Sequence, residues 1–79
     1  MAGKRASRAD KVIGRALREH RAAAGISQTD LADALGLSWQ QVQKYEAGVN
    51  KLSVSTFVKA ARAFKLLPSA LLHEVEAKV

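Results

Sequence analysis

The sequence predicts an all-α domain built from five helices, and three observations lead to this expectation. A chain of 79 residues forms one small domain, because at this length only about 60% of the unfolded surface can be buried. Apolar residues recur at helical spacing, and cap residues mark where the helices begin and end. No stretch alternates as a strand does, and the absence of cysteine excludes disulfides and thiolate metal sites.

The charge of the chain is strongly positive, and most of the excess lies in its first third. Thirteen Lys and Arg residues stand against seven Asp and Glu residues, which gives a net charge of +6. Seven of the basic residues precede Gly25. Such an excess favours a polyanionic partner. No apolar run approaches the roughly 18 residues of a membrane span, so we expect no membrane partner, and the absence of cysteine fits an intracellular, cytoplasmic location.

The first helix is expected to begin at Ser7 or Asp10 and to end near Ala24. An apolar stripe with helical spacing supports it, and the arginines lie largely on the other faces. The stripe consists of Val12, Ile13, Ala16, Leu17, His20 and Ala24. Gly25 then suits the left-handed residue that follows many helices.

Two short helices separated by a tight turn are expected next. Ser27 begins a Ser-x-x-Asp capping pattern, so the second helix should cover about residues 28–35 and end at Gly36. Ser38 begins a Ser-x-x-Gln pattern, which predicts a full capping box for a third helix that ends before Gly48. Helices joined by a turn of about three residues cross at a steep angle, as in a helix-turn-helix.

Two further helices complete the predicted fold. Ser53 is a candidate N-cap for the fourth helix, and Pro68 suits the first turn of the fifth. Their apolar positions are Phe57, Ala60, Ala61 and Phe64 in the fourth helix and Leu71, Leu72 and Val75 in the fifth. The junction between them lacks the usual signals, because Lys65 stands where a glycine would end a helix and Leu67 is a weak N-cap.

A specific set of small and apolar residues lies in the run QTDLADALGLSWQQVQKYEAG. Ala32 must be small where the two helices cross, and Gly36 suits a conformation that a β-carbon would strain. Val42 and Tyr45 would anchor the third helix in the core. Together with Gln28, this pattern resembles the helix-turn-helix of the phage-repressor and Cro-like (XRE-type) family.

The resemblance implies a compact five-helix repressor-like DNA-binding domain that reads double-stranded DNA and regulates transcription. Its second and third helices would form the helix-turn-helix, with Ser38 to Ala47 in the major groove as the recognition helix. It implies a bacterial or phage-encoded protein. The sequence holds no nucleophile elbow or glycine-rich phosphate loop, so we expect no enzyme, cofactor, metal or small-molecule ligand. His20 and His73 lie too far apart in the sequence, without other ligands nearby, to indicate a metal site.

The outward side of the expected recognition helix is rich in amides. Gln40 and Gln43 can each donate and accept toward adenine N6 and N7, and Lys44 can reach guanine O6 and N7 or a phosphate. The predicted base contacts are Ser38, Trp39, Gln40, Gln43 and Lys44. Two alternatives stay open. The glutamines could be ordinary solvated helix formers, and Trp39 could either stack on sugars and thymine methyl groups or pack on the edge of the domain.

A second set of residues is implied to contact the phosphate backbone: Gln28, Gln41, Asn50 and Lys51. Gln28 would stand at the start of the second helix, where free backbone N–H groups favour an anion. The alternative for Asn50 and Lys51 is a solvated turn. Arg21 and Glu46 match positions that form a salt bridge in related repressors, so we expect them to tie the first helix to the third.

A homodimer on a palindromic operator is expected, because two-fold dimers read the half-sites of such operators. The fifth helix is the expected dimer surface, with Leu71, Leu72 and Val75 exposed on the monomer. Residues 1–9 are assigned to a flexible basic arm that either solubilises the chain or contacts DNA, and residues 10–79 to a single domain. The competing hypothesis is a protein-interaction module, such as an antitoxin-type component, that buries the same third-helix surface against protein.

Overall fold

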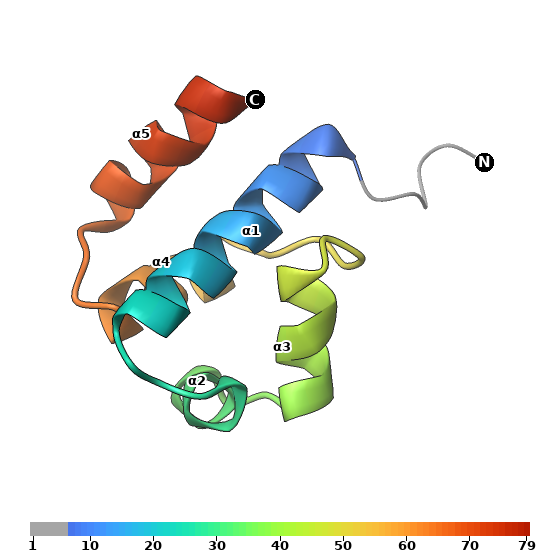
Figure 1. The fold of residues 1–79 in the computed structure, drawn as a ribbon, viewed down its shortest axis with the longest axis vertical. Helices are drawn as coiled ribbons and strands as arrows, with labels where there is room; N and C mark the ends of the chain where they lie inside the picture. The colour runs from blue at the N-terminus through green and yellow to red at the C-terminus, as the bar shows by residue number, and fades with distance from the viewer. Residues whose placement is uncertain (1–6) are drawn as a thin grey trace.

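The chain folds into five α-helices, and the predicted all-α class is confirmed. A computed structural model describes residues 7–79, and these residues form no strand. The helices are α1 (Arg8–Ala23), α2 (Gln28–Leu35), α3 (Trp39–Glu46), α4 (Val54–Ala63) and α5 (Pro68–Lys78). α1 packs against both α3 and α5, and it runs antiparallel to α5 (Figure 1).

Reciprocal caps start the first two helices. The Ser7 side chain accepts a hydrogen bond from the backbone N–H of Asp10 (3.1 Å), and the Asp10 carboxylate accepts one from the backbone N–H of Ser7 (2.8 Å). Ser27 and Asp30 form the same pair at α2, with both bonds 3.0 Å long, as the capping pattern predicted. The backbone donors hold the pKa of both carboxyl groups below its ordinary value.

The start of α1 also bears on the predicted arm. Because Ser7 caps the helix, Arg8 and Ala9 belong to α1, although the sequence assigned them to the arm. The rest of the predicted arm, residues 1–6, lies outside the described residues.

The cap of α3 differs from the prediction. Ser38 Oγ accepts a hydrogen bond from the backbone N–H of Gln41 (3.2 Å), but the Gln41 side chain does not return to the backbone of Ser38. Its Oε1 instead accepts a hydrogen bond from Asn50 Nδ2 (3.2 Å). The predicted full capping box is therefore wrong, since the Gln41 side chain is turned toward Asn50 instead of the backbone of Ser38.

One hydrophobic core holds the helices together. Its most buried large side chains come from four of them: Leu17 of α1, Leu31 of α2, Val42 of α3 and Leu71 of α5. Ala60 and Ala61 of α4 are fully buried, and their small size lets α4 approach closely. Burial of one large apolar side chain contributes roughly 1.5–3 kcal/mol, so Val42 alone gives α3 a firm attachment to the core.

The fifth helix contributes more to this core than the sequence suggested. Leu71 and Val75 are only 1% and 3% exposed, whereas Leu72 is 57% exposed. The expectation that all three lie exposed on the monomer is therefore wrong for Leu71 and Val75. Their four-residue spacing places both on the side of α5 that faces the core, and Leu72 falls on the outer side.

Two glycines let α1 cross the C-terminal end of α3 at very short range. A β-carbon on Gly14 would collide with the backbone oxygen of Tyr45 and lie 2.8 Å from that of Glu46. A β-carbon on Gly48 would lie 2.7 Å from the Cα of Lys11. The sequence analysis did not single out Gly14, because a glycine inside a helix shows its reason only when the crossing helix is known.

The junction between α4 and α5 forms without its usual residues. Lys65 adopts the left-handed conformation, with φ of 61°, at the position where a glycine would be expected. Leu67 is the N-cap of α5 and makes no side-chain hydrogen bond to the helix, while Pro68 begins the helix. The weak signals in the sequence thus correspond to a strained residue and an unfilled cap.

Candidate nucleic-acid interface

The predicted recognition helix presents its polar residues to solvent and its apolar side to the core. Val42 is 1% exposed and Tyr45 is half-buried. The five predicted base contacts are all exposed on α3 and its N-cap: Ser38, Trp39, Gln40, Gln43 and Lys44. The structure therefore brings them together on one element whose other side is fixed.

Trp39 stands apart from the other four. It is 45% exposed, so its ring is partly covered by the domain and partly open to solvent at the start of α3. This geometry fits both roles considered for Trp39. The covered part of the ring packs on the edge of the domain, and the open part is accessible to a ligand.

A buried ion pair ties α1 to α3. The Glu46 side chain is only 4% exposed, and its two carboxylate oxygens accept hydrogen bonds from Arg21 Nε and Nη2. Arg21 Nη1 also donates to the backbone oxygen of Ile26 (2.9 Å), in the turn before α2. A bidentate pair of this kind has a fixed geometry as well as a favourable energy, so Arg21 holds the C-terminal end of α3 and the start of α2 in place.

Gln28 joins the same network. Its Nε2 donates to Glu46 Oε1 (3.0 Å), which gives the buried carboxylate a third donor. A carboxamide nitrogen has two hydrogens, so one N–H of Gln28 and its oxygen stay available. The predicted phosphate contact thus lies at the start of α2 as expected, but with part of its hydrogen-bonding capacity already used.

The other predicted phosphate contacts also have partners within the domain. Gln41 and Asn50 are hydrogen-bonded to each other, as described for the cap of α3. Lys51 Nζ lies 3.2 Å from Asp10 Oδ2, with the lysine side chain 62% exposed. This contact links the loop after α3 to the cap of α1. The Asp10 carboxylate thus accepts hydrogen bonds from both Ser7 and Lys51.

An open hollow lies where α1, α2 and α3 meet, beside the buried ion pair. It has a volume of about 410 Å³ and is lined by Arg18, Arg21, Gln28, Gln43, Glu46 and Ala47. Arg18 is exposed, and no acidic side chain of the described residues forms a salt bridge with it. Sequence analysis gave Arg18 no specific role, because its position beside Gln43 depends on how α1 crosses α3.

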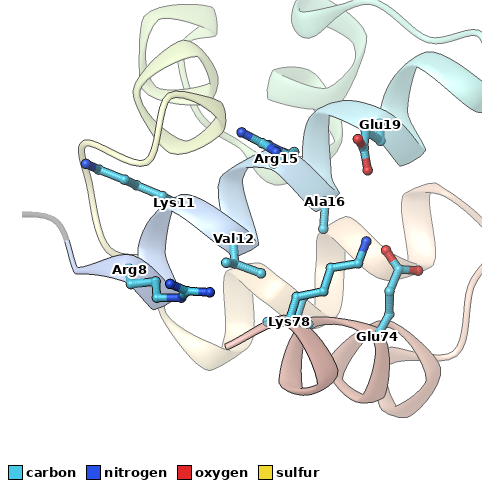
Figure 2. A pocket seen from close by; sticks show the side chains of 9 residues that line it. Arg8, Lys11, Val12, Arg15, Ala16, Glu19, Glu74 and Lys78 are labelled. Atoms are coloured by element: carbon cyan, nitrogen blue, oxygen red, sulfur yellow. The ribbon is translucent and has the colours of Figure 1, made fainter.

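A second hollow of about 270 Å³ separates α1 from α5 (Figure 2). Basic side chains dominate its α1 side, and Glu19 of α1 and Glu74 and Lys78 of α5 also line it (Figure 2). His20 Nε2 lies 2.9 Å from Glu74 Oε1, which joins α1 to α5. Within residues 7–79 no group of three or more possible ligands could hold a metal ion, and no helix there is long and apolar enough to cross a membrane.

Comparison with known proteins shows which family this fold belongs to. Residues 17–71 match a family model described as helix-turn-helix. An XRE-family like protein from Pseudomonas syringae pv. tomato has a similar structure, with a TM-score of 0.77 and 35% identity over 90% of this chain and 87% of the other. The chain belongs to the XRE-type helix-turn-helix family. Within it, α2 and α3 are the helix-turn-helix pair that the sequence predicted.

Two further similarities concern a curated relative and a solved structure with the same fold. An uncharacterized HTH-type transcriptional regulator of Sinorhizobium fredii is 36% identical over 70 residues, which cover 89% of this chain and 49% of the relative. The clp gene regulator ClgR from Corynebacterium glutamicum shares the fold with a TM-score of 0.84 and 23% identity, over 92% of this chain and 78% of the other. The chain spans about half the length of the first curated relatives it matches.

Proposed function

We propose that this domain binds double-stranded DNA sequence-specifically and regulates transcription, with the segment Ser38 to Ala47 in the major groove. The observation that carries the proposal is the two-sided construction of α3. Its inner side is fixed by Val42 and by the ion pair of Glu46 with Arg21, while its outer side carries exposed groups that match base edges. Membership of the XRE-type family supports the same conclusion.

Discrimination between base pairs is assigned to the exposed groups of α3. Gln40 and Gln43 would pair with adenine N6 and N7, and Lys44 with guanine or a nearby phosphate. Ser38 and Trp39 would complete the edge that enters the groove first. Because Val42 and the Arg21–Glu46 pair hold the inner side of the helix, these side chains would reach into the groove from a fixed backbone.

Positioning on the backbone is assigned to Gln28, Gln41, Asn50 and Lys51. Lys51 would exchange Asp10 for a phosphate or contact both, since its side chain is mostly exposed. Gln28 would use its second N–H while the first stays on Glu46. Such contacts fix register on the duplex and carry no sequence information of their own.

The proposed regulator acts as a homodimer on a palindromic operator. Leu72, on the outer side of α5, is an exposed apolar residue available for the contact between copies, whereas Leu71 and Val75 belong to the core. A dimer through Leu72 would repeat the same surface on both copies, as a two-fold axis requires.

Selection of duplexes from a random pool, followed by titration at several salt concentrations, tests the proposal. We expect one enriched palindromic site, a change in Trp39 fluorescence on binding, and an affinity that falls steeply with salt as counterions are released. Absence of binding to any duplex at 50 mM salt would overturn the proposal. Binding with equal affinity to all sequences would overturn its sequence-specific part.

A further inference from the structure

The hollow between α1, α2 and α3 combines features that suit a single phosphate group. Arg18 enters it from α1, Gln28 from α2 and Gln43 from α3. A guanidinium group presents several N–H donors in a planar fork that matches phosphate oxygens. Three donor side chains from three different helices therefore converge on one open space.

The charge of the hollow is positive in spite of the glutamate in its wall. Glu46 is paired with Arg21 through two hydrogen bonds, so these two charges offset each other. Gln28 adds a third donor to the same carboxylate. Arg18 is left as the charge that an incoming anion would meet, and it lies on the exposed side of α1.

The position of the hollow fits the backbone of a duplex rather than a base. Two phosphate backbones flank the major groove, which is about 12 Å wide, so a helix lying in the groove has phosphates beside it. Gln43 lies both on the outer side of α3 and in the wall of the hollow. A phosphate seated there would lie next to the residues that read the bases.

We propose that Arg18, with the free N–H of Gln28, holds one DNA phosphate in this hollow, so that α1 contacts the backbone directly. Gln43 at the edge of the hollow is then fixed relative to that phosphate, which sets its reach toward the bases. This inference rests on the proposed function and adds a residue of α1 to its backbone contacts.

The test combines variants of the full chain with a selected operator in which single phosphates are replaced by neutral methylphosphonates. Arg18→Ala is the test variant. Arg15→Ala removes the same charge one turn earlier on α1, in the wall of the other hollow, and Arg62→Ala removes it on α4. Circular dichroism first shows that each variant keeps the helical content of the parent chain.

We expect Arg18→Ala to weaken binding roughly tenfold on selected and random duplexes alike, as loss of a hydrogen-bonded charge does, and to reduce the salt slope by about 1. Arg15→Ala and Arg62→Ala should each weaken binding less than about threefold, because exposed charges away from the backbone are screened. At one phosphate position, the methylphosphonate should weaken the parent chain but not Arg18→Ala.

Two results would overturn the inference while leaving the proposed function intact. One is that all three variants weaken binding equally. The other is that no phosphate position shows a loss specific to chains that contain Arg18. If the parent chain binds no duplex at all, the proposed function itself is wrong and the inference is rejected with it.

Discussion

The outer sides of α1 and α3 differ in chemistry although the two helices lie in contact. α1 holds five Lys and Arg residues and two acidic residues, whereas α3 holds one lysine and one glutamate. The outer side of α3 carries amides, a hydroxyl and one lysine. Charge attracts any duplex, while amides distinguish one base pair from another. In the proposed function, attraction and discrimination would therefore lie on different helices, which the Arg21–Glu46 pair joins.

Removal of the link between the two helices should have the largest effect. We expect Glu46→Ala to lower the free energy of unfolding by about 3–5 kcal/mol, because it leaves the Arg21 charge half-buried without its partner. Asp33→Ala removes the same charge from an exposed position of α2 and should change it by less than about 0.5 kcal/mol. Urea denaturation followed by circular dichroism measures both. Equal losses would show that the ion pair does not stabilise the fold.

Loss of a proposed base contact and loss of a proposed phosphate contact should change DNA affinity in different ways. Gln40→Ala is expected to weaken binding to the selected operator by about 1–3 kcal/mol with little effect on random DNA. Lys51→Ala should weaken both alike and reduce the salt slope by about 1. Parallel titrations of both duplexes at several salt concentrations decide this. Equal losses for Gln40→Ala on the two duplexes would contradict its assignment to base contacts.

A change outside both helices should alter stability without altering DNA binding. Lys65→Gly relieves a left-handed lysine and should raise the free energy of unfolding by about 0.5–1 kcal/mol. The matched control is Lys59→Gly, in the interior of α4, which should lower it by about 1 kcal/mol. If the two substitutions shift the urea midpoint in the same direction, the left-handed conformation of Lys65 costs no stability.

The smallest expected effect is the pH dependence of stability that comes from the Asp10 carboxyl group. The pKa of Asp10 lies below its ordinary 3.8, chiefly because the backbone N–H of Ser7 donates to the carboxylate and secondarily through Lys51. Its contribution to stability is therefore complete above pH 3.8 and is lost as the pH falls through the lower, folded-state pKa. We expect Asp10→Asn to be less stable than the parent chain at neutral pH, and the difference to shrink with acid. A difference that stays constant between pH 6 and pH 2 would refute this coupling.

Most of the fold followed from local signals. Ser27 with Asp30, Gly36 and Ser53 mark helix ends through interactions within a few residues, and such interactions can be recognised in a sequence. The apolar side of α5 was harder. Leu71, Leu72 and Val75 all fit a helical stripe, and only the packing of α5 on α1 and α4 separates the two buried residues from the exposed one.

The candidate site was predictable in its residues but not in their mutual contacts. The outward position of Gln40, Gln43 and Lys44 follows from helix geometry and from the buried Val42. The bonds of Lys51 to Asp10 and of Asn50 to Gln41 join segments whose distance depends on the whole fold. The sequence identified these four residues as cap or loop residues, but it did not show which of them pair with each other.

The close crossing at Gly14 and Gly48 has a consequence for how specificity can change. Backbone meets backbone there, so neither helix can shift or rotate much against the other without a collision. The outer side of α3 has no such restriction, since its side chains project into solvent. If α3 reads bases as proposed, a new operator would require exchange of only a few exposed side chains, while the crossing keeps the backbone of α3 in the same place.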